Sequence, residues 1–185
     1  MIKMAEIEIK GMDKLVAKLQ KLPEIYKDAI WDGALDVAEK VEGYAVRELQ
    51  SSVKYGTGEL ARSIKYEVVE KDGKIVGRVW SDSAVAWYRT FGTGLVGEAS
   101  PKKLPDGFEP SYRQTPWFIL ADKVDVDLNA VYGMPKIKIN GKTYYRTKGQ
   151  PARQFFEPAI EKVSDEADTI VANRVNQAVH DKLGG

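Results

Sequence analysis

An apolar stripe about seven helical turns long constrains the fold of this chain more than any other feature of its sequence. Between residues 25 and 49, apolar side chains recur every three or four positions, which is the spacing that places them on one face of an α-helix. The sequence therefore predicts one long amphipathic helix here. The stripe consists of Ile25, Ala29 or Ile30, Ala34, Val37, Val41, Ala45 and Leu49.

Two glycines and a proline modify this helical pattern. Gly33 and Gly43 each cost on the order of 1 kcal/mol relative to alanine inside a helix, so we expect a bend or close packing against another backbone. Pro23 suits the first turn of the long helix, and Asp13 can cap a separate short helix ahead of it. The apolar side of that short helix would carry Leu15, Leu19 and Leu22.

A tight hairpin follows the long helix. Residues 55–63 are interpreted as a glycine-containing loop that leads into a strand, and Asp-Gly at 72–73 marks a two-residue turn. The resulting register places Glu67 opposite Arg78 on the outer face, where opposite charges attract. Trp80 falls on the same face, where it either covers a lysine stem or contacts a partner. The face expected to enter the core carries Ile64, Tyr66, Val68 and Val79.

The second half of the chain begins without any periodicity. Prolines and glycines break the pattern between residues 95 and 117, so we expect a loop that is flexible until bound. Aspartate and asparagine alternate with apolar residues over 125–129, which we interpret as a solvated strand face. Asn-Gly at 140–141 predicts a second hairpin, and residues 156–178 predict a closing helix. Its apolar positions are Phe156, Ile160, Val163, Ala167, Ile170 or Val171, Val175 and Ala178.

Composition narrows the possible classes of protein. With 185 residues the chain is long enough for one core of ordinary size, so we expect a single domain with an insertion at 95–149. Its net charge of +1 provides no global attraction to nucleic acid or membrane. The absence of cysteine excludes a disulfide scaffold, thiolate ligands and a cysteine nucleophile.

The opening residues argue against a signal peptide. Ile7 and Ile9 alternate with charged residues, which predicts a short half-buried strand ending at Gly11 instead of a continuous apolar stretch. No later run reaches membrane-spanning length. We therefore expect a soluble protein that is made and kept in the cytosol and does not associate with membranes.

Several apparent motifs fail on inspection. Residues 92–97 match a dinucleotide-binding pattern, but a loop is expected after them instead of a helix. Gly-Lys-Thr at 141–143 continues into a strand, unlike a phosphate loop. Residues 125–136 begin like a calcium loop but lack its glycine and its closing glutamate. The single histidine, His180, has no organised acid nearby. We therefore expect no catalytic residue, no cofactor and no metal.

One basic segment remains. Residues 136–153 contain no acidic side chain and two adjacent tyrosines, a combination that nucleic-acid-binding proteins use to contact a phosphate backbone and stack on bases. Lysines also protect an exposed hairpin edge against aggregation. We slightly favour a docking arm for an acidic protein surface or for passing DNA. Its candidate residues are Lys136, Lys138, Lys142, Tyr144, Tyr145, Arg146, Lys148 and Arg153.

Residues 84–94 combine three aromatic side chains with two glycines. Trp87, Tyr88 and Phe91 carry a large apolar area, and Gly92 and Gly94 permit the backbone to turn or be approached closely. Such a segment forms either the centre of a core or a contact surface. For Phe91 alone the core is the expected place, as it is for Phe155 and Phe156.

Three separated blocks, taken together, resemble one family. Residues 56–63 (GTGELARS), 84–93 (AVAWYRTFGT) and 151–160 (PARQFFEPAI) resemble, in order, the blocks of the head-to-tail joining, or tail-completion, proteins of long-tailed bacteriophages and prophages. The flanking helices fit as well, so that the resemblance covers nearly the whole chain except 95–149. The sequence departs from the usual family pattern before the first block and at Thr90, Gln154 and Glu157, positions that bear on specific partner contacts.

This resemblance implies an α+β fold, with a long N-terminal helix packed on a small antiparallel sheet, a loop-and-hairpin insertion and a C-terminal helix. It implies a non-catalytic virion protein that assembles as a homo-oligomeric ring, with six subunits by analogy with tail symmetry, between the head connector and the tail tube. Its partners would be a connector or stopper and a tail tube or tail terminator protein, with transient contact to packaged DNA.

The residues are assigned to this role as follows. A ring subunit needs surfaces that close by rotation, which exposed aromatics suit, and arginines suit partner carboxylates. The interface candidates are Arg62, Trp80, Trp87, Arg89, Trp117 and Arg153. The candidates for special backbone geometry are Gly56, Gly58, Gly92 and Gly94. A nucleic-acid-binding module that uses the basic hairpin remains the alternative.

Overall fold

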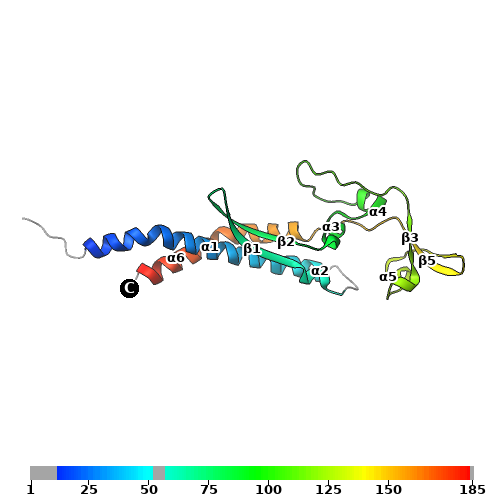
Figure 1. The fold of residues 1–185 in the computed structure, drawn as a ribbon, viewed down its shortest axis with the longest axis horizontal. Coiled ribbons are helices and arrows are strands. Elements are labelled where there is room, and N and C mark those ends of the chain that lie inside the picture. Colours follow the sequence, from blue (N-terminus) through cyan, green and yellow to red (C-terminus); the bar gives the residue numbers. More distant parts are fainter. Residues whose placement is uncertain (1–11, 52–56, 184–185) are drawn as a thin grey trace, which may run out of the picture. The chain divides into compact units, whose positions relative to one another are not determined.

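The computed structural model describes residues 12–51 and 57–183 (Figure 1). The expected strand at residues 7–9 and the expected special geometry of Gly56 lie outside these residues. The elements are α1 (Met12–Ser51), α2 (Glu59–Arg62), β1 (Ile64–Lys71), β2 (Lys74–Ser81), α3 (Ala84–Phe91), α4 (Gly94–Ala99), β3 (Trp117–Leu120), the 3-10 turn η1 (Ala121–Lys123), α5 (Leu128–Tyr132), β4 (Lys136–Ile139), β5 (Lys142–Thr147) and α6 (Phe156–Leu183). The α+β class with a long first helix, small antiparallel sheets and a closing helix is confirmed.

The chain forms two compact units. The first unit contains α1 up to residue 48, the β1–β2 hairpin up to residue 80, and α6 from residue 159. The second unit contains residues 49–63 and 81–158. The segment 95–149, expected as an insertion into a single domain, is part of the second unit together with α2, α3 and residues 150–158.

Helix α1 is continuous through Pro23, so the expected division into two helices is wrong. Proline removes the hydrogen bond to the carbonyl of Leu19, and both residues are exposed, which leaves that carbonyl open to water. Ile25 and Ala29, which follow directly, are buried. Packing of these side chains therefore holds the helix together across the proline.

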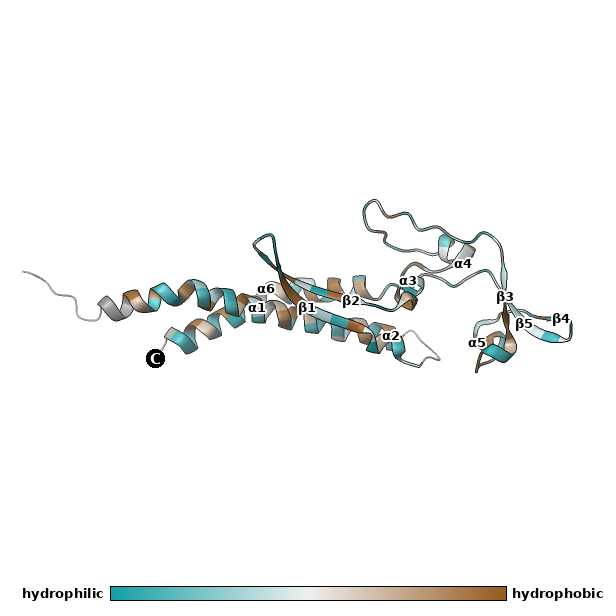
Figure 2. Ribbon diagram, viewed as in Figure 1, coloured by the Kyte–Doolittle hydropathy of each residue, from teal (hydrophilic) through white to brown (hydrophobic). Residues whose placement is uncertain are grey.

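The predicted apolar stripe of α1 forms the core of the first unit. Ala29 is buried whereas Ile30 is exposed, which settles the alternative left open by the spacing. Figure 2 shows hydrophilic and hydrophobic stretches alternating along α1 and α6, as amphipathic helices require. The buried side chains of this core are Ile25, Ala29, Ala38, Val41, Ala45, Ile64, Ala159 and Val163.

The two helix glycines differ in their surroundings. A Cβ added at Gly33 would lie 2.9 Å from the Cα of Val171, so α1 and α6 approach each other at backbone distance there. A Cβ at Gly43 would meet only the Nη2 atom of Arg47, at 3.8 Å. The expectation of close backbone packing is therefore confirmed at Gly33 and not at Gly43.

The β1–β2 hairpin turns where the sequence predicts. Asp72 and Gly73 have φ values of 53° and 72°, and Arg78 lies 3.7 Å from Glu67 across the hairpin. The expectation that Tyr66 enters the core is wrong, because its side chain is 37 % exposed. Helix α1 approaches the hairpin at Gly77 of β2, where an added Cβ would lie 3.2 Å from the Ala34 carbonyl oxygen.

The sheet of the second unit has the strand order β3-β5-β4. Trp117 pairs with Thr147 and Leu120 with Tyr144, while Lys136 pairs with Tyr145 and Ile139 with Lys142. The predicted turn joins β4 to β5, and Asn140 and Gly141 have positive φ values of 49° and 77°. The sequence indicated the hairpin but not the third strand, because β3 is short and carries no alternation.

Two local expectations for this unit are wrong. Residues 125–129 do not form a strand: the carboxylate of Asp127 accepts hydrogen bonds from the backbone N–H groups of Asn129 (2.9 Å) and Ala130 (3.3 Å) and begins helix α5. Residues 94–99 are helical, so the irregular connection spans 100–116 instead of beginning at residue 95.

Candidate interaction surfaces

The three blocks that carry the family resemblance meet in the second unit. The hydroxyl groups of Ser63 and Ser81 lie 2.7 Å apart, and the Ser81 hydroxyl oxygen also accepts a hydrogen bond from the backbone N–H of Ser83, the N-cap of α3. At the other end of α3, the backbone N–H of Arg153 donates to the carbonyl of Arg89 at 2.8 Å. Helix α3 therefore joins the first block to the third.

Glycines allow the second and third blocks to cross closely. Gly92 is buried with φ 74° and ψ −178°, a conformation that is essentially restricted to glycine. A Cβ there would lie 2.6 Å from the Cα of Gly97 and 2.7 Å from the backbone nitrogen of Ala152. Gly94 has φ 57°, and a Cβ added there would clash with the carbonyl oxygen of Lys148. Gly58, with φ 74°, is the N-cap of α2.

Hydrogen bonds tie the connection 100–116 to this crossing. The backbone N–H of Lys103 donates to the Gln154 side-chain oxygen at 2.8 Å, and the Gln154 side-chain N–H₂ donates back to the Lys103 carbonyl at 2.8 Å. The Lys103 ammonium group lies 2.6 Å from Glu157, and the Tyr112 hydroxyl donates to the Phe91 carbonyl at 3.0 Å. Gln154 and Glu157, two positions where the sequence departs from the family pattern, thus hold this connection.

Helix α3 presents aromatic side chains to solvent. Trp87 and Tyr88 are 57 % and 55 % exposed, and Val85 beside them is also exposed. Phe91 and Phe108 flank Trp87 with ring centroids 5.3 Å and 5.7 Å away. Of the two roles that the sequence left open for this segment, the exposure of these rings favours a contact surface.

The three candidate arginines have different environments. The Nη1 group of Arg62 donates to the carbonyl of Thr57 at 3.0 Å, so this side chain supports the loop that precedes α2. Arg89 is half-buried; burial, and secondarily the positive charge of Arg153, lowers the pKa of its guanidinium group. Arg153 is exposed. Arg89 and Arg153 therefore bring two positive charges near each other at the C-terminal end of α3.

The other large aromatic candidates are less accessible. Trp80 and Trp117 are half-buried, and the indole ring of Trp117 has the guanidinium group of Arg113 5.3 Å from its centroid. Phe155 is 1 % exposed and packs against Phe156 with ring centroids 4.3 Å apart. The expectation that Phe155 is a core anchor is confirmed.

The basic hairpin is less free to bind DNA than its sequence suggested. The Lys136 ammonium group lies 2.6 Å from the Asp127 carboxylate, and this hydrogen bond raises the pKa of Lys136 and lowers that of Asp127. Tyr145 is only 5 % exposed, and its hydroxyl group donates to Asp127 at 3.3 Å. Tyr145 is therefore a core residue that cannot stack on a base. The members of the hairpin that are exposed are Lys136, Lys138, Lys142, Arg146 and Lys148.

The β3–β5–β4 sheet has an exposed apolar face that sequence analysis missed. Because side chains alternate along a strand, the pairing places Phe118 and Tyr144 on the face opposite Tyr145. Phe118 is 48 % exposed, and Ile139 on the same face is exposed as well. Lys142 and Arg146 flank these apolar side chains. The signal was available in the alternation of Lys and Ile along β4.

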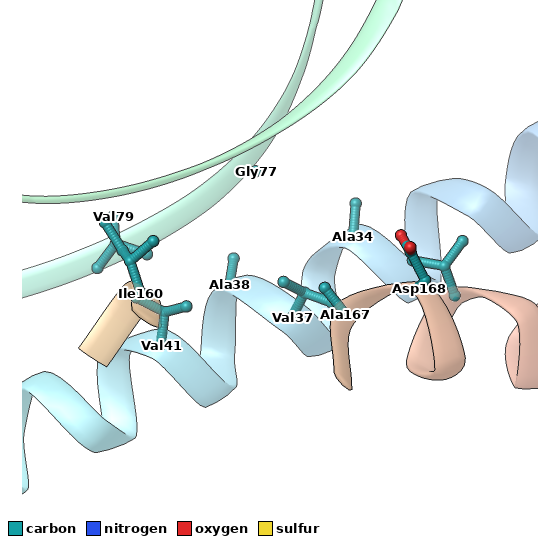
Figure 3. A pocket seen from close by; sticks show the side chains of 10 residues that line it. Ala34, Val37, Ala38, Val41, Gly77, Val79, Ile160, Ala167 and Asp168 are labelled. Carbon is teal, nitrogen blue, oxygen red and sulfur yellow. The ribbon is translucent and has the colours of Figure 1, made fainter. Parts of the chain in front are cut away.

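A second apolar feature lies in the first unit. A groove of about 370 Å³ runs between α1, β2 and α6. Figure 3 shows Val79 above Val41 of α1, with Ile160 of α6 beside them. Apart from Asp168, the groove is lined by apolar side chains and a glycine.

The glycine pattern at 92–97 overlaps the six-residue helix α4, the irregular connection 100–116 follows, and α3 precedes the pattern where a dinucleotide site needs a strand. In the described part of the chain, no three His, Cys, Asp or Glu side chains are placed to hold a metal ion. Over the same residues, no helix has the length and apolar character needed to cross a membrane.

The fold and these surfaces define an α+β protein with an exposed aromatic helix and an exposed apolar sheet face. Comparison with protein-family models, with curated proteins and with solved structures yields no match to this chain.

Proposed function

We propose that this chain is a structural protein of the bacteriophage neck, which forms a ring that completes the tail and joins it to the head connector. The exposed aromatic side chains of α3 carry the proposal. Trp87 and Tyr88 lie in a block that resembles the tail-completion family, and large exposed aromatics are enriched at protein interfaces. The ring would be a homo-oligomer of six subunits, located in the virion and assembled in the host cytoplasm.

The meeting of the three blocks supports the same role. Ser63 bonds to Ser81, which bonds to Ser83 at the start of α3, and Arg153 bonds to Arg89 near the end of α3. Such a junction holds the aromatic helix at a fixed place on the second unit. Rigid presentation of a contact helix lowers the entropy lost when a partner binds.

Removing the gene from its source phage or prophage tests the proposal. We expect DNA-filled heads and separate tails in electron micrographs, and restoration of joined particles by the wild-type gene but not by Trp87→Ala with Tyr88→Ala. Normal joined particles without the gene, or mature particles that lack the protein, would contradict a neck role.

Nucleic-acid binding through the basic hairpin is the weaker alternative. Lys138, Lys142 and Arg146 are exposed, but Lys136 is paired with Asp127 and Tyr145 is buried. Salt-sensitive binding of DNA by the purified chain, lost when these three residues are replaced by glutamate, would favour this alternative.

A further inference from the structure

The outer edge of strand β4 is available for pairing. β4 is a terminal strand of the β3–β5–β4 sheet. In a two-residue hairpin the residues that flank the turn exchange hydrogen bonds, so the backbone groups of Ile139 and Ile137 face β5. Those of Lys136 and Lys138 then point outward. Outside the sheet itself, no backbone hydrogen bond from any described residue reaches either lysine.

The side chains of β4 determine which strand could pair with it. Lys136 and Lys138 lie on the face of Tyr145, and Ile137 and Ile139 lie on the apolar face that includes Phe118. Lysines on an edge strand discourage pairing with neutral or basic strands. An added strand that alternates acidic and apolar residues would place acids beside the lysines and extend the apolar face.

The opening residues of the chain have such an alternating sequence. Residues 6–9 read Glu-Ile-Glu-Ile, and β4 reads Lys-Ile-Lys-Ile over residues 136–139. In an antiparallel pairing with Glu6 opposite Lys138 and Glu8 opposite Lys136, each acid meets a base and Ile7 lies opposite Ile137. Opposite-charge cross-strand pairs and added main-chain hydrogen bonds both stabilise such an arrangement.

Asp127 of the same chain competes for one of the two lysines but leaves the other available to the acidic residues at 6 and 8. Asp127 already binds the Lys136 ammonium group at 2.6 Å. The ammonium group of Lys138 has no ion-pair partner among the residues that the structure describes, and its side chain is exposed. Lys138 is therefore the cation on this edge that is available to pair with an acidic neighbour.

We propose that residues 5–10 of a second copy of this chain add to β4 as a fourth strand of the sheet. The strand addition itself is independent of the proposed neck function. Only its role in building a ring rests on that function. Because the acidic strand and the basic edge are different surfaces, the contact is head-to-tail, and repetition of a head-to-tail contact generates rings or filaments.

Cysteine cross-linking tests this contact directly, since the chain has no cysteine of its own. Full-length Ile7→Cys protein is mixed with full-length Ile137→Cys protein carrying a tag of different mass, and the mixture is oxidised mildly. We expect a disulfide-linked heterodimer. Ile160→Cys, which replaces an exposed isoleucine on α6, serves as the control partner and should give no more than background cross-linking.

Charge reversal provides an independent readout. Lys138→Glu should weaken self-association, measured by sedimentation, roughly three- to ten-fold, because an attractive cross-strand pair becomes repulsive. Adding Glu6→Lys should restore the affinity, whereas Lys142→Glu, on the other face of the sheet, should change it little. Removal of residues 1–10 should abolish the association that depends on β4.

Each result decides the proposal. A heterodimer together with charge rescue supports strand addition by a second copy. Absence of the heterodimer, or a disulfide that forms only within one chain in the Ile7→Cys, Ile137→Cys double variant, overturns it. Neither of these negative results bears on the neck role, which is judged from particles that lack the gene.

Discussion

The backbone N–H of Thr93 donates a hydrogen bond to the carbonyl oxygen of Gln150 at 2.9 Å, and the backbone N–H of Gln150 donates one to the hydroxyl oxygen of Thr93 at 3.1 Å. This reciprocal pair joins the second family-like block to the residue that precedes the third. It also brings Gly92 against Ala152, so the close crossing of the two segments requires a residue without a side chain at position 92.

Substitution of Gly92 should therefore destabilise the second unit. Gly92→Ala places a methyl group 2.6 Å from the Cα of Gly97, and we expect a loss of about 2–4 kcal/mol of unfolding free energy from strain and overpacking. Gly107→Ala is the control: its φ of 73° is similar, but an added Cβ meets nothing within 4 Å. Urea denaturation of both variants measures the difference. Equal losses of unfolding free energy in the two variants would show that the positive φ alone, and not the close contact at Gly92, causes the destabilisation.

The two glycines of α1 should respond to alanine with opposite signs. Gly43→Ala should raise the unfolding free energy by about 0.5–1 kcal/mol, because alanine is the better helix former and the site is open. Gly33→Ala should lower it by about 1–3 kcal/mol, since the new methyl group meets the backbone of Val171. Thermal unfolding followed by circular dichroism checks both. Stabilisation by both substitutions would contradict the close approach of α1 and α6.

Asp127 should make the β4–β5 region sensitive to acid. Its hydrogen bond to Lys136 lowers the pKa of the carboxyl group, so its contribution to stability is fully present above the ordinary carboxyl pKa of about 3.9. This contribution is lost as the pH falls through the lower native pKa. Nuclear magnetic resonance of the Tyr145 ring should report a transition in that range.

Two variants separate the roles of Asp127. Asp127→Asn keeps an oxygen that can cap α5 but removes the charge that pairs with Lys136. Asp127→Ala removes both, so it should destabilise the region more. Both variants should lose the acid transition that the wild-type carboxyl group causes. A transition that persists in Asp127→Asn would assign the titration to another group.

Gln154 should control the order of the connection 100–116. Gln154→Ala removes the acceptor of the Lys103 amide and the donor to its carbonyl. We expect faster hydrogen exchange at Lys103, because local opening no longer breaks these bonds. Glu157→Gln weakens the ion pair with the Lys103 side chain but leaves its backbone bonds, and serves as the control. Unchanged exchange in Gln154→Ala would show that other contacts order this segment.

Much of the fold could be predicted because its signals are local. The stripe of α1, both two-residue turns and the closing helix follow from spacing and turn chemistry. Pro23 led to the wrong expectation of two helices, because proline usually interrupts a helix. The tertiary packing of Ile25 and Ala29 keeps the helix continuous, and local sequence does not show that packing. Alternation at 125–129 misled because Asp127 caps a helix instead of facing solvent from a strand.

The candidate surfaces were harder to predict because they depend on long-range neighbours. The pairing of Lys136 with Asp127 and the burial of Tyr145 remove two members of the basic hairpin, and no spacing rule indicates either. The exposed rings of Trp87 and Tyr88 had two possible roles until burial was known. Strand β3 gives the sheet its apolar face, and its run of four residues is too short to show a period.

The hydrogen bonds between Thr93 and Gln150 also have a consequence for the evolution of the segment between them. The two ends of the segment between these residues lie together, so a segment of different length could be inserted there at a modest entropic cost if it kept the contacts that Gly97, Lys103 and Tyr112 make with the crossing. Evolution could then change the exposed β3–β5–β4 sheet, while the helices before Thr93 and after Gln150 keep their sequence.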